Sequence, residues 1–300
     1  MQNKLLDKCC LCPRKCGVNR NAGIRGFCGA ADRLIAARAA LHFWEEPCLS
    51  GQRGSGTVFF SGCSLRCIYC QNHNIANASA GKEITANRLA DIFLELEQQG
   101  ALNINLVTPT HFVPQIISAL EIAKRKGLAL PIVCNCGGYE LTETLQLLEG
   151  YIDIYLPDFK YISSETAAHY SNAPDYPSIA KAAVAEMLRQ TGRLTCNAEG
   201  IAERGTLVRH LVLPGHIDES KKIIQYLYET YGDDVYMSIM NQYTPMPSVK
   251  EIAPLNRRLS AAEYDEVIDF ALSLGVENAF IQEDGTAEES FIPEFDAEGI

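Results

Sequence analysis

The stretch that decides the fold is Gly62-Cys63-Ser-Leu-Arg-Cys67-Ile-Tyr-Cys70-Gln-Asn72, which carries three cysteines at C-x3-C-x2-C spacing. It comes directly after Gly56-Thr-Val-Phe-Phe60, a run of β-branched and aromatic residues that predicts a strand. Cysteines clustered at short spacings are typical of ligands to one metal centre in a chain that is not exported. The sequence therefore predicts a metal centre on the loop after the first strand.

The spacing favours an iron–sulfur cluster over other uses of cysteine. Cys63, Cys67 and Cys70 can each bind one iron of a [4Fe–4S] cubane, which leaves the fourth iron open. That iron can take a chelating ligand, and the methionine amine and carboxylate of S-adenosylmethionine (SAM) suit it. Zinc is one alternative, although structural zinc prefers paired C-x2-C units and four ligands. Chance enrichment in a chain with 12 cysteines is the other alternative.

Strand-like and helix-like segments alternate from residue 56 onward. Strands are predicted at 56–63, 104–108, 132–135, 151–156, 206–213 and 235–240, with a last short one at 279–282, and helices at 86–99, 114–126, 142–148, 178–191, 220–231 and 260–274. Repeated strand–helix units imply an α/β fold with a parallel sheet covered by helices. Six main strands are too few for a closed eight-stranded barrel, so we expect a partial, open (β/α)6 barrel.

Residues 1–55 do not follow this alternation and are rich in Cys, Arg and Gly. We expect a Cys-rich N-terminal extension over 1–55, a core barrel over 56–282 and an acidic, extended tail over 283–300. Within the extension, four cysteines form C-x2-C-x3-C-x11-C, with Cys10 as a spare; they are Cys9, Cys12, Cys16 and Cys28. Four thiolates suit structural zinc or a second iron–sulfur cluster, and unligated thiols are the alternative.

Composition and charge narrow the class of protein. The chain has 300 residues, is 47% hydrophobic and carries a net charge of −11. An acidic chain gains nothing from phosphate counterion release, so we expect no nucleic-acid partner. The sequence has neither an N-terminal signal pattern nor an apolar run of about 18 residues, so we expect a cytoplasmic protein that does not enter membranes.

Six motifs spread over nearly the whole chain carry a family resemblance. They are Cys12-Pro-Arg-Lys-Cys16-Gly-Val-Asn-Arg20, Gly54-Ser-Gly-Thr-Val-Phe-Phe-Ser-Gly-Cys63, Cys70-Gln-Asn72, Val107-Thr-Pro-Thr-His-Phe-Val-Pro114, Leu156-Pro-Asp-Phe-Lys160 and Arg209-His-Leu-Val-Leu-Pro-Gly215. With them the chain resembles the radical SAM superfamily, and within it the pyruvate formate-lyase activating enzyme subgroup of glycyl radical enzyme activases. The resemblance implies a barrel of radical SAM type that cleaves SAM reductively at a [4Fe–4S] cluster to a 5′-deoxyadenosyl radical.

The resemblance also implies partners and site residues. The radical would remove a glycine hydrogen from a partner glycyl radical enzyme, and a flavodoxin or ferredoxin-type protein would supply the electron. Thr108-Pro-Thr-His111 stands where the family usually carries the Gly-Gly-Glu that binds the methionine amine. A Pro-stiffened turn with a capping Thr is the alternative there. The residues expected to hold SAM are Tyr69, Thr108 or Thr110, His111, Asn135, Asp158, Lys160 and His210.

Two of these assignments leave alternatives, and one family feature is absent. Asp158 and Lys160 could form a plain ion pair, and alternation sends only one of Arg209 and His210 inward, for which the resemblance favours His210. Cys134 occupies the position of an Asp that helps the type activase bind a monovalent cation. Cys134 and Cys136 share a strand face and would be either small core residues or part of the site.

Two other functions fit parts of the pattern. One is a radical SAM enzyme that acts on a small molecule or on a different protein. The other is an iron–sulfur electron carrier without catalysis, but a carrier would not need Asp158, Lys160 or His210 near an open iron.

Overall fold

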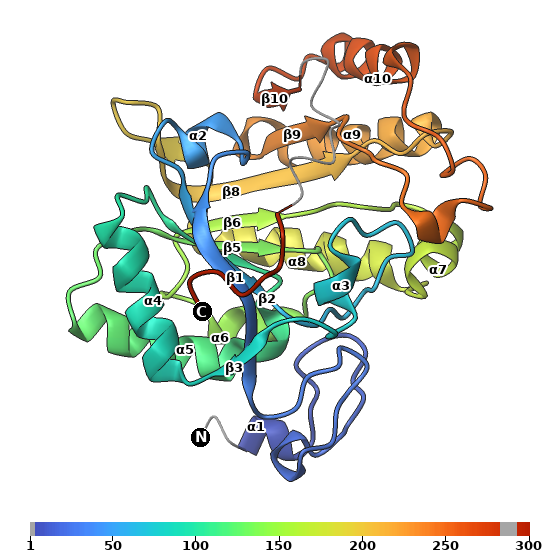
Figure 1. The fold of residues 1–300 in the computed structure, drawn as a ribbon. Coiled ribbons are helices and arrows are strands. Elements are labelled where there is room, and N and C mark those ends of the chain that lie inside the picture. Colours follow the sequence, from blue (N-terminus) through green and yellow to red (C-terminus); the bar gives the residue numbers. More distant parts are fainter. Residues whose placement is uncertain (1–3, 283–292) are drawn as a thin grey trace.

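The computed structural model describes residues 4–282 and 293–300 and is built around one sheet, ordered β10-β9-β8-β6-β5-β4-β2-β1-β3 (Figure 1). The strands are β1 (Leu34–His42), β2 (Ser55–Phe60), β3 (Lys82–Ile84), β4 (Ile104–Val107), β5 (Ile132–Cys136), β6 (Ile154–Pro157), β7 (Thr195–Cys196), β8 (Ala202–Leu211), β9 (Tyr236–Met240) and β10 (Ala279–Ile281). Every neighbouring pair from β2 to β10 along this order is parallel. The sheet ends at β10 and β3 within the described residues, so the predicted open α/β barrel is confirmed.

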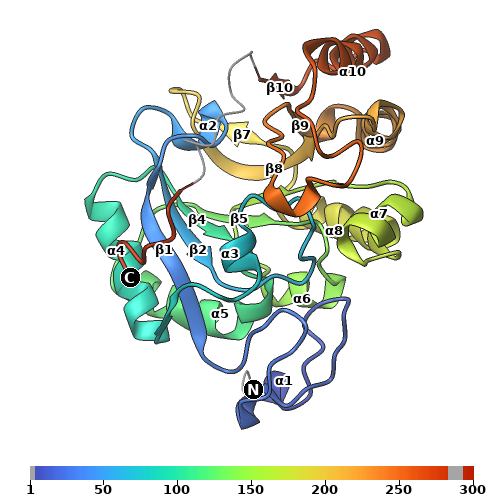
Figure 2. The ribbon, with the colours of Figure 1, turned by 45° about the vertical axis from the view of Figure 1, so that its right-hand side comes forward.

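Helices cover the outer side of the sheet, with α4 packed on α5, α6 on α8 and α9 on α10 (Figure 2). Their bounds are α4 (Ala86–Gln98), α5 (Val113–Arg125), α6 (Thr142–Leu147), α7 (Ser164–Ser171), α8 (Tyr176–Thr191), α9 (Ile217–Tyr231) and α10 (Ala261–Leu274), with single turns at α1 (Lys4–Asp7), α2 (Pro47–Ser50) and α3 (His73–Ala76). The local sequence determines where several helices begin. At the start of α4 the Thr85 side chain accepts from the Arg88 N–H, and at the start of α10 the capping box predicted at Ser260 and Glu263 is present. None of the described helices is long and apolar enough to cross a membrane.

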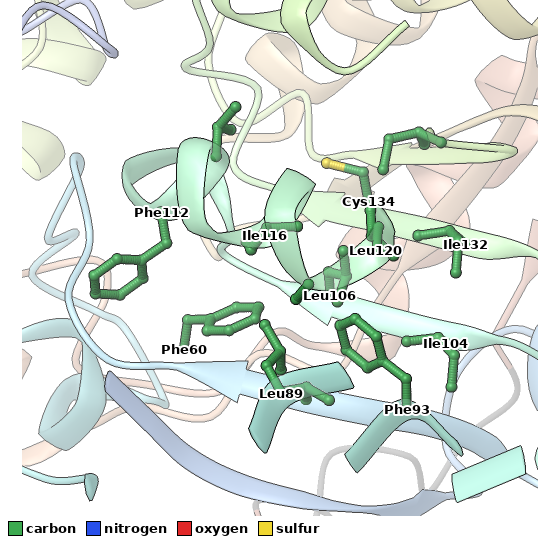
Figure 3. Packing of buried hydrophobic residues seen from close by; sticks show 14 of the residues in the cluster. Phe60, Leu89, Phe93, Ile104, Leu106, Phe112, Ile116, Leu120, Ile132 and Cys134 are labelled. Carbon is green, nitrogen blue, oxygen red and sulfur yellow. The ribbon is translucent and has the colours of Figure 1, made fainter. Parts of the chain in front are cut away.

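The largest core lies between the sheet and helices α4 and α5 (Figure 3). Phe93 from α4 and Ile116 from α5 meet side chains from the outer face of the strands, such as Phe60 and Leu106. Cys134 belongs to this core at 1% exposure, and Cys136 joins it. Both cysteines therefore face the helices and not the inside of the barrel, which is the core alternative raised by the sequence.

The sheet begins before residue 56. β1 pairs antiparallel with β2, from Ala36 opposite Phe60 to His42 opposite Ser55, and β3 pairs with the start of β1. The extension expected over 1–55 is therefore not separate from the barrel, because its second half is a strand of the same sheet. Residues 4–33, hereafter the Cys-rich segment, precede the first strand and form the dark blue loops near the N-terminus in Figure 1.

The C-terminal residues lie along β1. The Ala297 N–H donates to the Ala37 carbonyl at 3.0 Å, and the Ala39 N–H donates to the Glu298 carbonyl at 2.9 Å. Arg38 adds ion pairs to Asp296 and Glu298. Residues 293–300 of the predicted tail are thus held against the barrel, and residues 283–292 lie outside the described part of the chain.

Candidate functional site

The cluster loop, residues 61–72, leaves the carboxyl end of β2 through a tight turn. Gly62 has φ +99°, and its N–H donates to the Ile75 carbonyl at 2.6 Å. The His111 ring nitrogen Nε2 donates to the Ser61 carbonyl at 2.8 Å. Burial lowers the pKa of His111 to about 4, so the ring is neutral at pH 7 and serves as a hydrogen-bond donor to this turn.

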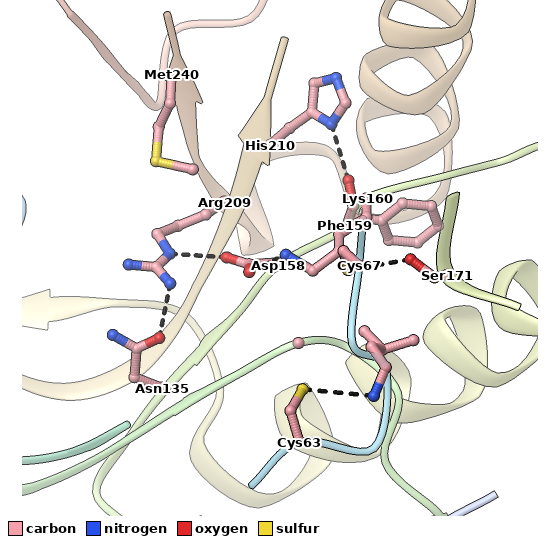
Figure 4. A network of polar contacts seen from close by, with 12 residues as sticks. Cys63, Cys67, Asn135, Asp158, Phe159, Lys160, Ser171, Arg209, His210 and Met240 are labelled. Carbon is pink, nitrogen blue, oxygen red and sulfur yellow. Dashed lines mark hydrogen bonds and ion pairs between the residues drawn. The ribbon is translucent and has the colours of Figure 1, made fainter. Parts of the chain in front are cut away.

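The three thiols of the loop lie within electrostatic reach of one another. Cys63 Sγ accepts from the Leu65 N–H at 3.4 Å, and Cys67 Sγ accepts from the Ser171 hydroxyl at 3.0 Å (Figure 4). Burial first, and then the neighbouring thiols, raise the pKa of Cys70 to about 12 and also raise that of Cys63. Cys63 and Cys70 are therefore uncharged thiols at pH 7 until a cationic metal centre stabilises their thiolates.

The donor set of the cluster loop fits a cubane. Among residues 4–282 and 293–300, no three His, Cys, Asp or Glu side chains converge as a ready site for one metal ion. A [4Fe–4S] cluster does not need such convergence, because each thiolate binds a different iron. Cys67 and Cys70 also line a cleft inside the barrel, so a cluster on these thiols would border that cleft.

The cleft has a volume of about 240 Å³ and opens at the carboxyl ends of the parallel strands. This is the end at which β/α barrels carry their active sites. Its lining combines the cluster loop with polar side chains from five strands or strand ends, and with apolar residues. The lining includes Glu45, Phe59, Cys67, Tyr69, Cys70, Val107, Asn135, Asp158, Lys160, Arg209, Met240 and Gln242.

Two cations and two carboxylates form a linked network in the cleft. Figure 4 labels Asp158, Lys160, Arg209 and Asn135 of this network. Asp158 pairs with Lys160 Nζ at 2.6 Å and with Arg209 Nε at 3.0 Å. Arg209 also donates to Asn135 at 2.6 Å and pairs with Glu45 at 3.2 Å. Burial opposes the charge of Asp158, but Lys160 and Arg209 outweigh it and bring the pKa of Asp158 below its usual value. The wall therefore presents fixed charges of both signs, which suits a zwitterionic ligand.

Glu45 is a site residue that the sequence reasoning missed. Its side chain is 9% exposed and accepts from Asn105 at 2.9 Å as well as from Arg209. Burial raises the pKa of Glu45, and Arg209 opposes this. The available signal was the apolar run Leu34–His42 before it, which is the strand that brings Glu45 to the barrel.

Six of the predicted cofactor and cluster residues line the cleft, namely Cys67, Tyr69, Cys70, Asn135, Asp158 and Lys160. Cys63 is not part of the lining, but it belongs to the same loop and interacts electrostatically with Cys67. Thr108, at φ +57°, follows the cleft-lining Val107 but is not part of the lining. Thr110 instead donates to the buried Glu140 at 3.0 Å.

Neither predicted histidine reaches the cleft. His111 supports the Ser61 turn, as described above. The His210 Nδ1 donates to the Phe159 carbonyl at 2.8 Å, and its Nε2 lies 2.9 Å from the Ser220 hydroxyl. The choice of His210 over Arg209 as the inward residue of β8 is therefore wrong, because the ring is used on the outer face and Arg209 lines the cleft.

The Cys-rich segment packs against the cluster loop. Arg14, between Cys12 and Cys16, donates through Nε to the Ser64 carbonyl and through Nη2 to the Ser171 carbonyl, both at 2.8 Å. Its guanidinium also lies 4.2 Å from the Phe27 ring centroid. Cys9, Cys12, Cys16 and Cys28 gather in this segment and act electrostatically on one another.

Gly62 lies against the Cys-rich segment, and an alanine there is expected to lower iron content. A Cβ on Gly62 would lie 2.5 Å from the Cys28 carbonyl oxygen, and the positive φ adds backbone strain. We expect Gly62→Ala to retain less iron after anaerobic reconstitution and to unfold at lower denaturant. Gly100→Ala is the control, since Gly100 also has a positive φ (+93°) but has nothing within 4 Å of an added Cβ. Equal iron content in the two variants would show that the turn at Gly62 has no role in cluster assembly.

Comparisons with known proteins show sequence similarity to two relatives. The chain is 29% identical over 277 residues to the uncharacterized protein MJ0674 of Methanocaldococcus jannaschii, covering 89% of this chain and 75% of that protein. It is 29% identical over 117 residues to a pyruvate formate-lyase-activating enzyme of Clostridium pasteurianum, covering 36% of this chain and 46% of that enzyme.

Among solved structures, the fold is similar to that of Streptococcus suis SuiB bound to S-adenosylmethionine. The TM-score is 0.50 at 14% identity, and the match covers 75% of this chain and 49% of SuiB, so the chain spans about half of that protein. The model of the radical SAM superfamily matches residues 57–227, which hold the cluster loop and most of the cleft. This chain belongs to the radical SAM superfamily.

Proposed function

We propose that Cys63, Cys67 and Cys70 hold the [4Fe–4S] cluster and that SAM occupies the adjoining cleft. The observation that carries the proposal is the placement of two of these thiols beside the Asp158–Lys160–Arg209 network in one cleft. The superfamily implies both the cluster and SAM. When bound, the cluster and SAM supply reductive cleavage of the sulfonium, which releases methionine and gives a 5′-deoxyadenosyl radical.

The chain's own residues bind and orient the ligand. Lys160 interacts electrostatically with Cys67 and Cys70 of the cluster loop, and it is positioned to pair with the methionine carboxylate. Asp158 and Glu45 offer acceptors for the amine, and Asn135 offers an amide to the ribose or carboxylate. Tyr69 presents its backbone toward the adenine. Charged partners fixed by burial cost little reorganisation when the ligand enters.

The proposed substrate is a protein, namely the backbone glycine of a partner glycyl radical enzyme. The partial similarity to a pyruvate formate-lyase-activating enzyme supports this. A barrel of the same fold has been solved with a peptide, since SuiB is also known bound to the precursor peptide SuiA, at a TM-score of 0.51. A flavodoxin or ferredoxin-type protein is the proposed reductant.

The rim of the cleft also suits a polypeptide. Trp44 lines it while 61% exposed, and Gln71, Leu211 and Gln242 add both polar and apolar contact area. Aromatic, apolar and amide groups beside a cleft suit contacts with an extended peptide backbone.

The test separates SAM cleavage from the identity of the substrate. Reduced, anaerobic protein with SAM is expected to form 5′-deoxyadenosine, and an anaerobic extract of the producing cells is expected to gain a glycyl radical doublet by electron paramagnetic resonance. The same extract treated with the Cys63→Ala, Cys67→Ala, Cys70→Ala triple variant is the control. Deoxyadenosine without any protein radical, accompanied by a modified small molecule, would contradict the activase role and leave SAM cleavage standing.

A further inference from the structure

We propose that Cys9, Cys12, Cys16 and Cys28 hold a tetrathiolate metal centre of net negative charge, and that Arg20 is its buried counter-ion. Arg20 is 0% exposed, although it lies in a short turn of the Cys-rich segment, η1 (Arg20–Ala22). Its Nε and Nη2 donate to the Ala31 carbonyl at 2.8 and 2.6 Å, and its Nη1 donates to the His111 carbonyl at 2.6 Å. The same Nη1 lies 3.8 Å from Cys9 Sγ.

The partners of Arg20 satisfy its N–H groups without neutralising its charge. Within the described part of the chain, its hydrogen-bond partners are carbonyls and one thiol, and the Phe112 ring centroid lies 5.7 Å away, but no carboxylate pairs with the guanidinium. Buried charges in proteins are paired or placed beside a metal centre, because an uncompensated charge in a low-dielectric interior is strongly unfavourable. The guanidinium of Arg side chains does not deprotonate, so the compensating charge has to come from a neighbour.

The neighbours that can supply that charge are the four cysteines. Cys9 is in direct contact with the guanidinium, and Cys28 is within its electrostatic reach. Cys12 acts electrostatically with Cys9, Cys16 and Cys28. Four thiolates outweigh the two positive charges of a zinc ion or of an oxidised [4Fe–4S] core, so either centre would be an anion beside Arg20.

The backbone already brings the two halves of this set together. The Cys9 N–H donates to the Val18 carbonyl at 2.9 Å, and the Gly17 N–H donates back to the Cys9 carbonyl at 2.9 Å, which folds the first three cysteines into one hairpin-like loop. A Cβ on Gly26 would lie 2.8 Å from Cys16 Sγ and 4.0 Å from Cys28 Sγ, so Gly26 leaves room between those two thiols. A side chain at that position would fill the space in which the metal is proposed.

The thiols of Cys9, Cys12, Cys16 and Cys28 lie in one segment but do not surround a common metal position. No three of them converge within the described residues, as noted above for the whole set of ligand-type side chains. Thiol positions change by rotation about χ1 between staggered rotamers, which leaves the backbone in place. Cys16 is exposed, and its thiol lies 3.9 Å from the Cys9 carbonyl, whereas Cys9, Cys12 and Cys28 are buried at 5%, 8% and 6% exposure.

The proposed centre lies directly behind the turn that leads into Cys63. Arg20 holds the carbonyl of His111, the His111 ring holds the carbonyl of Ser61, and the Cys28 carbonyl abuts Gly62. The centre would thus fix the shape of the cluster loop from outside the cleft. This consequence for the cluster rests on the proposed function, whereas the metal centre itself does not.

The first experiment measures zinc and iron per chain in the Cys63→Ala, Cys67→Ala, Cys70→Ala background, where the proposed catalytic cluster is absent. We expect one zinc, or about four irons, to remain bound. Adding Cys12→Ser and Cys16→Ser is expected to remove that metal, and adding Cys10→Ser, at the spare cysteine, is expected to leave it. A background protein without bound metal would overturn the proposal, and so would equal metal content in the Cys12→Ser, Cys16→Ser and Cys10→Ser proteins.

The second experiment tests Arg20 with the metal ligands intact. Residues that contact the metal ligands typically contribute 10- to 100-fold to metal affinity. We therefore expect Arg20→Met to lose its metal at a concentration of competing chelator about 10- to 100-fold lower than the parent protein requires. Arg20→Lys keeps the charge and is expected to fall between Arg20→Met and the parent. Circular dichroism at each chelator concentration identifies loss of fold. Equal retention by Arg20→Met and the parent would make Arg20 only a clamp for the two carbonyls and overturn its role as counter-ion.

Discussion

Replacing any one of Cys63, Cys67 and Cys70 by alanine is expected to abolish the formation of 5′-deoxyadenosine from SAM. Each thiol is proposed to bind a different iron, and the loop offers no fourth cysteine to take its place. An iron that loses its thiolate leaves a cluster that is either not assembled or open at two irons. We expect activity to fall to the limit of detection, with iron content well below four per catalytic site.

Cys196→Ala is the matched control for these variants. Cys196 lies exposed on β7, far along the chain from the cluster loop, and it lines no part of the cleft. It is therefore expected to retain full iron and full turnover after the same anaerobic reconstitution. A loop variant that keeps both four irons and parental turnover would remove that cysteine from the ligand set.

Ser171 gives this cysteine loop a support that the motif alone does not reveal. Its hydroxyl donates to Cys67 Sγ, and its carbonyl accepts from Arg14 of the Cys-rich segment. One residue at the end of α7 thus contacts both cysteine-bearing parts of the chain. Such contacts orient a metal-binding side chain without themselves binding the metal, as the hydrogen-bond partners of metal ligands commonly do.

The alternation of strands and helices after residue 56 could be predicted from the spacing of apolar residues, because helices and strands bury side chains at different intervals along the sequence. The α4 residues Leu89, Ile92, Phe93 and Leu96 recur at helical spacing and all reach the core. β1 was not predicted as a strand. Its apolar run is interrupted by Arg38, and it follows a segment whose cysteines suggest a separate unit. What makes Leu34–His42 a strand is its pairing with β2, which is a tertiary contact.

In the site, too, some residues could be predicted from local sequence, whereas others depend on tertiary contacts. Cys63, Cys67 and Cys70 were predicted from spacing, and Asp158 and Lys160 from their place after a buried strand. Alternation says that Arg209 and His210 face opposite sides, but it does not say which one faces the cleft. The orientation depends on Phe159 and Ser220, which form hydrogen bonds with the two ring nitrogens of His210 on the outer face. Glu45 joins the cleft only because β1 lies beside β2 in the sheet.

Arg209→Met is expected to destabilise the fold by about 3–5 kcal/mol, because it leaves carboxylates buried without their cation. The Arg209 side chain is 14% exposed and pairs with Asp158, at 17%, and Glu45, at 9%. Denaturant unfolding of the anaerobic protein without cofactors measures the change. Neutralising a carboxylate that has lost its partner removes part of the cost, so Glu45→Gln in the Arg209→Met background is expected to recover stability. The same Glu45→Gln change alone is expected to lose stability, which makes the pair a double-mutant cycle.

The matched control for Arg209 is Arg189→Met. Arg189 also pairs with two carboxylates, Glu149 at 2.9 Å and Glu186 at 2.8 Å, but its side chain is 51% exposed on α8. Solvent screens ion pairs of this kind, so the same substitution is expected to cost much less there. Similar losses for the two arginines, or no recovery from Glu45→Gln, would mean that the network in the cleft does not hold compensated buried charge. In that case the polar wall would be solvated, and the binding of SAM could not rest on charges that burial fixes in place.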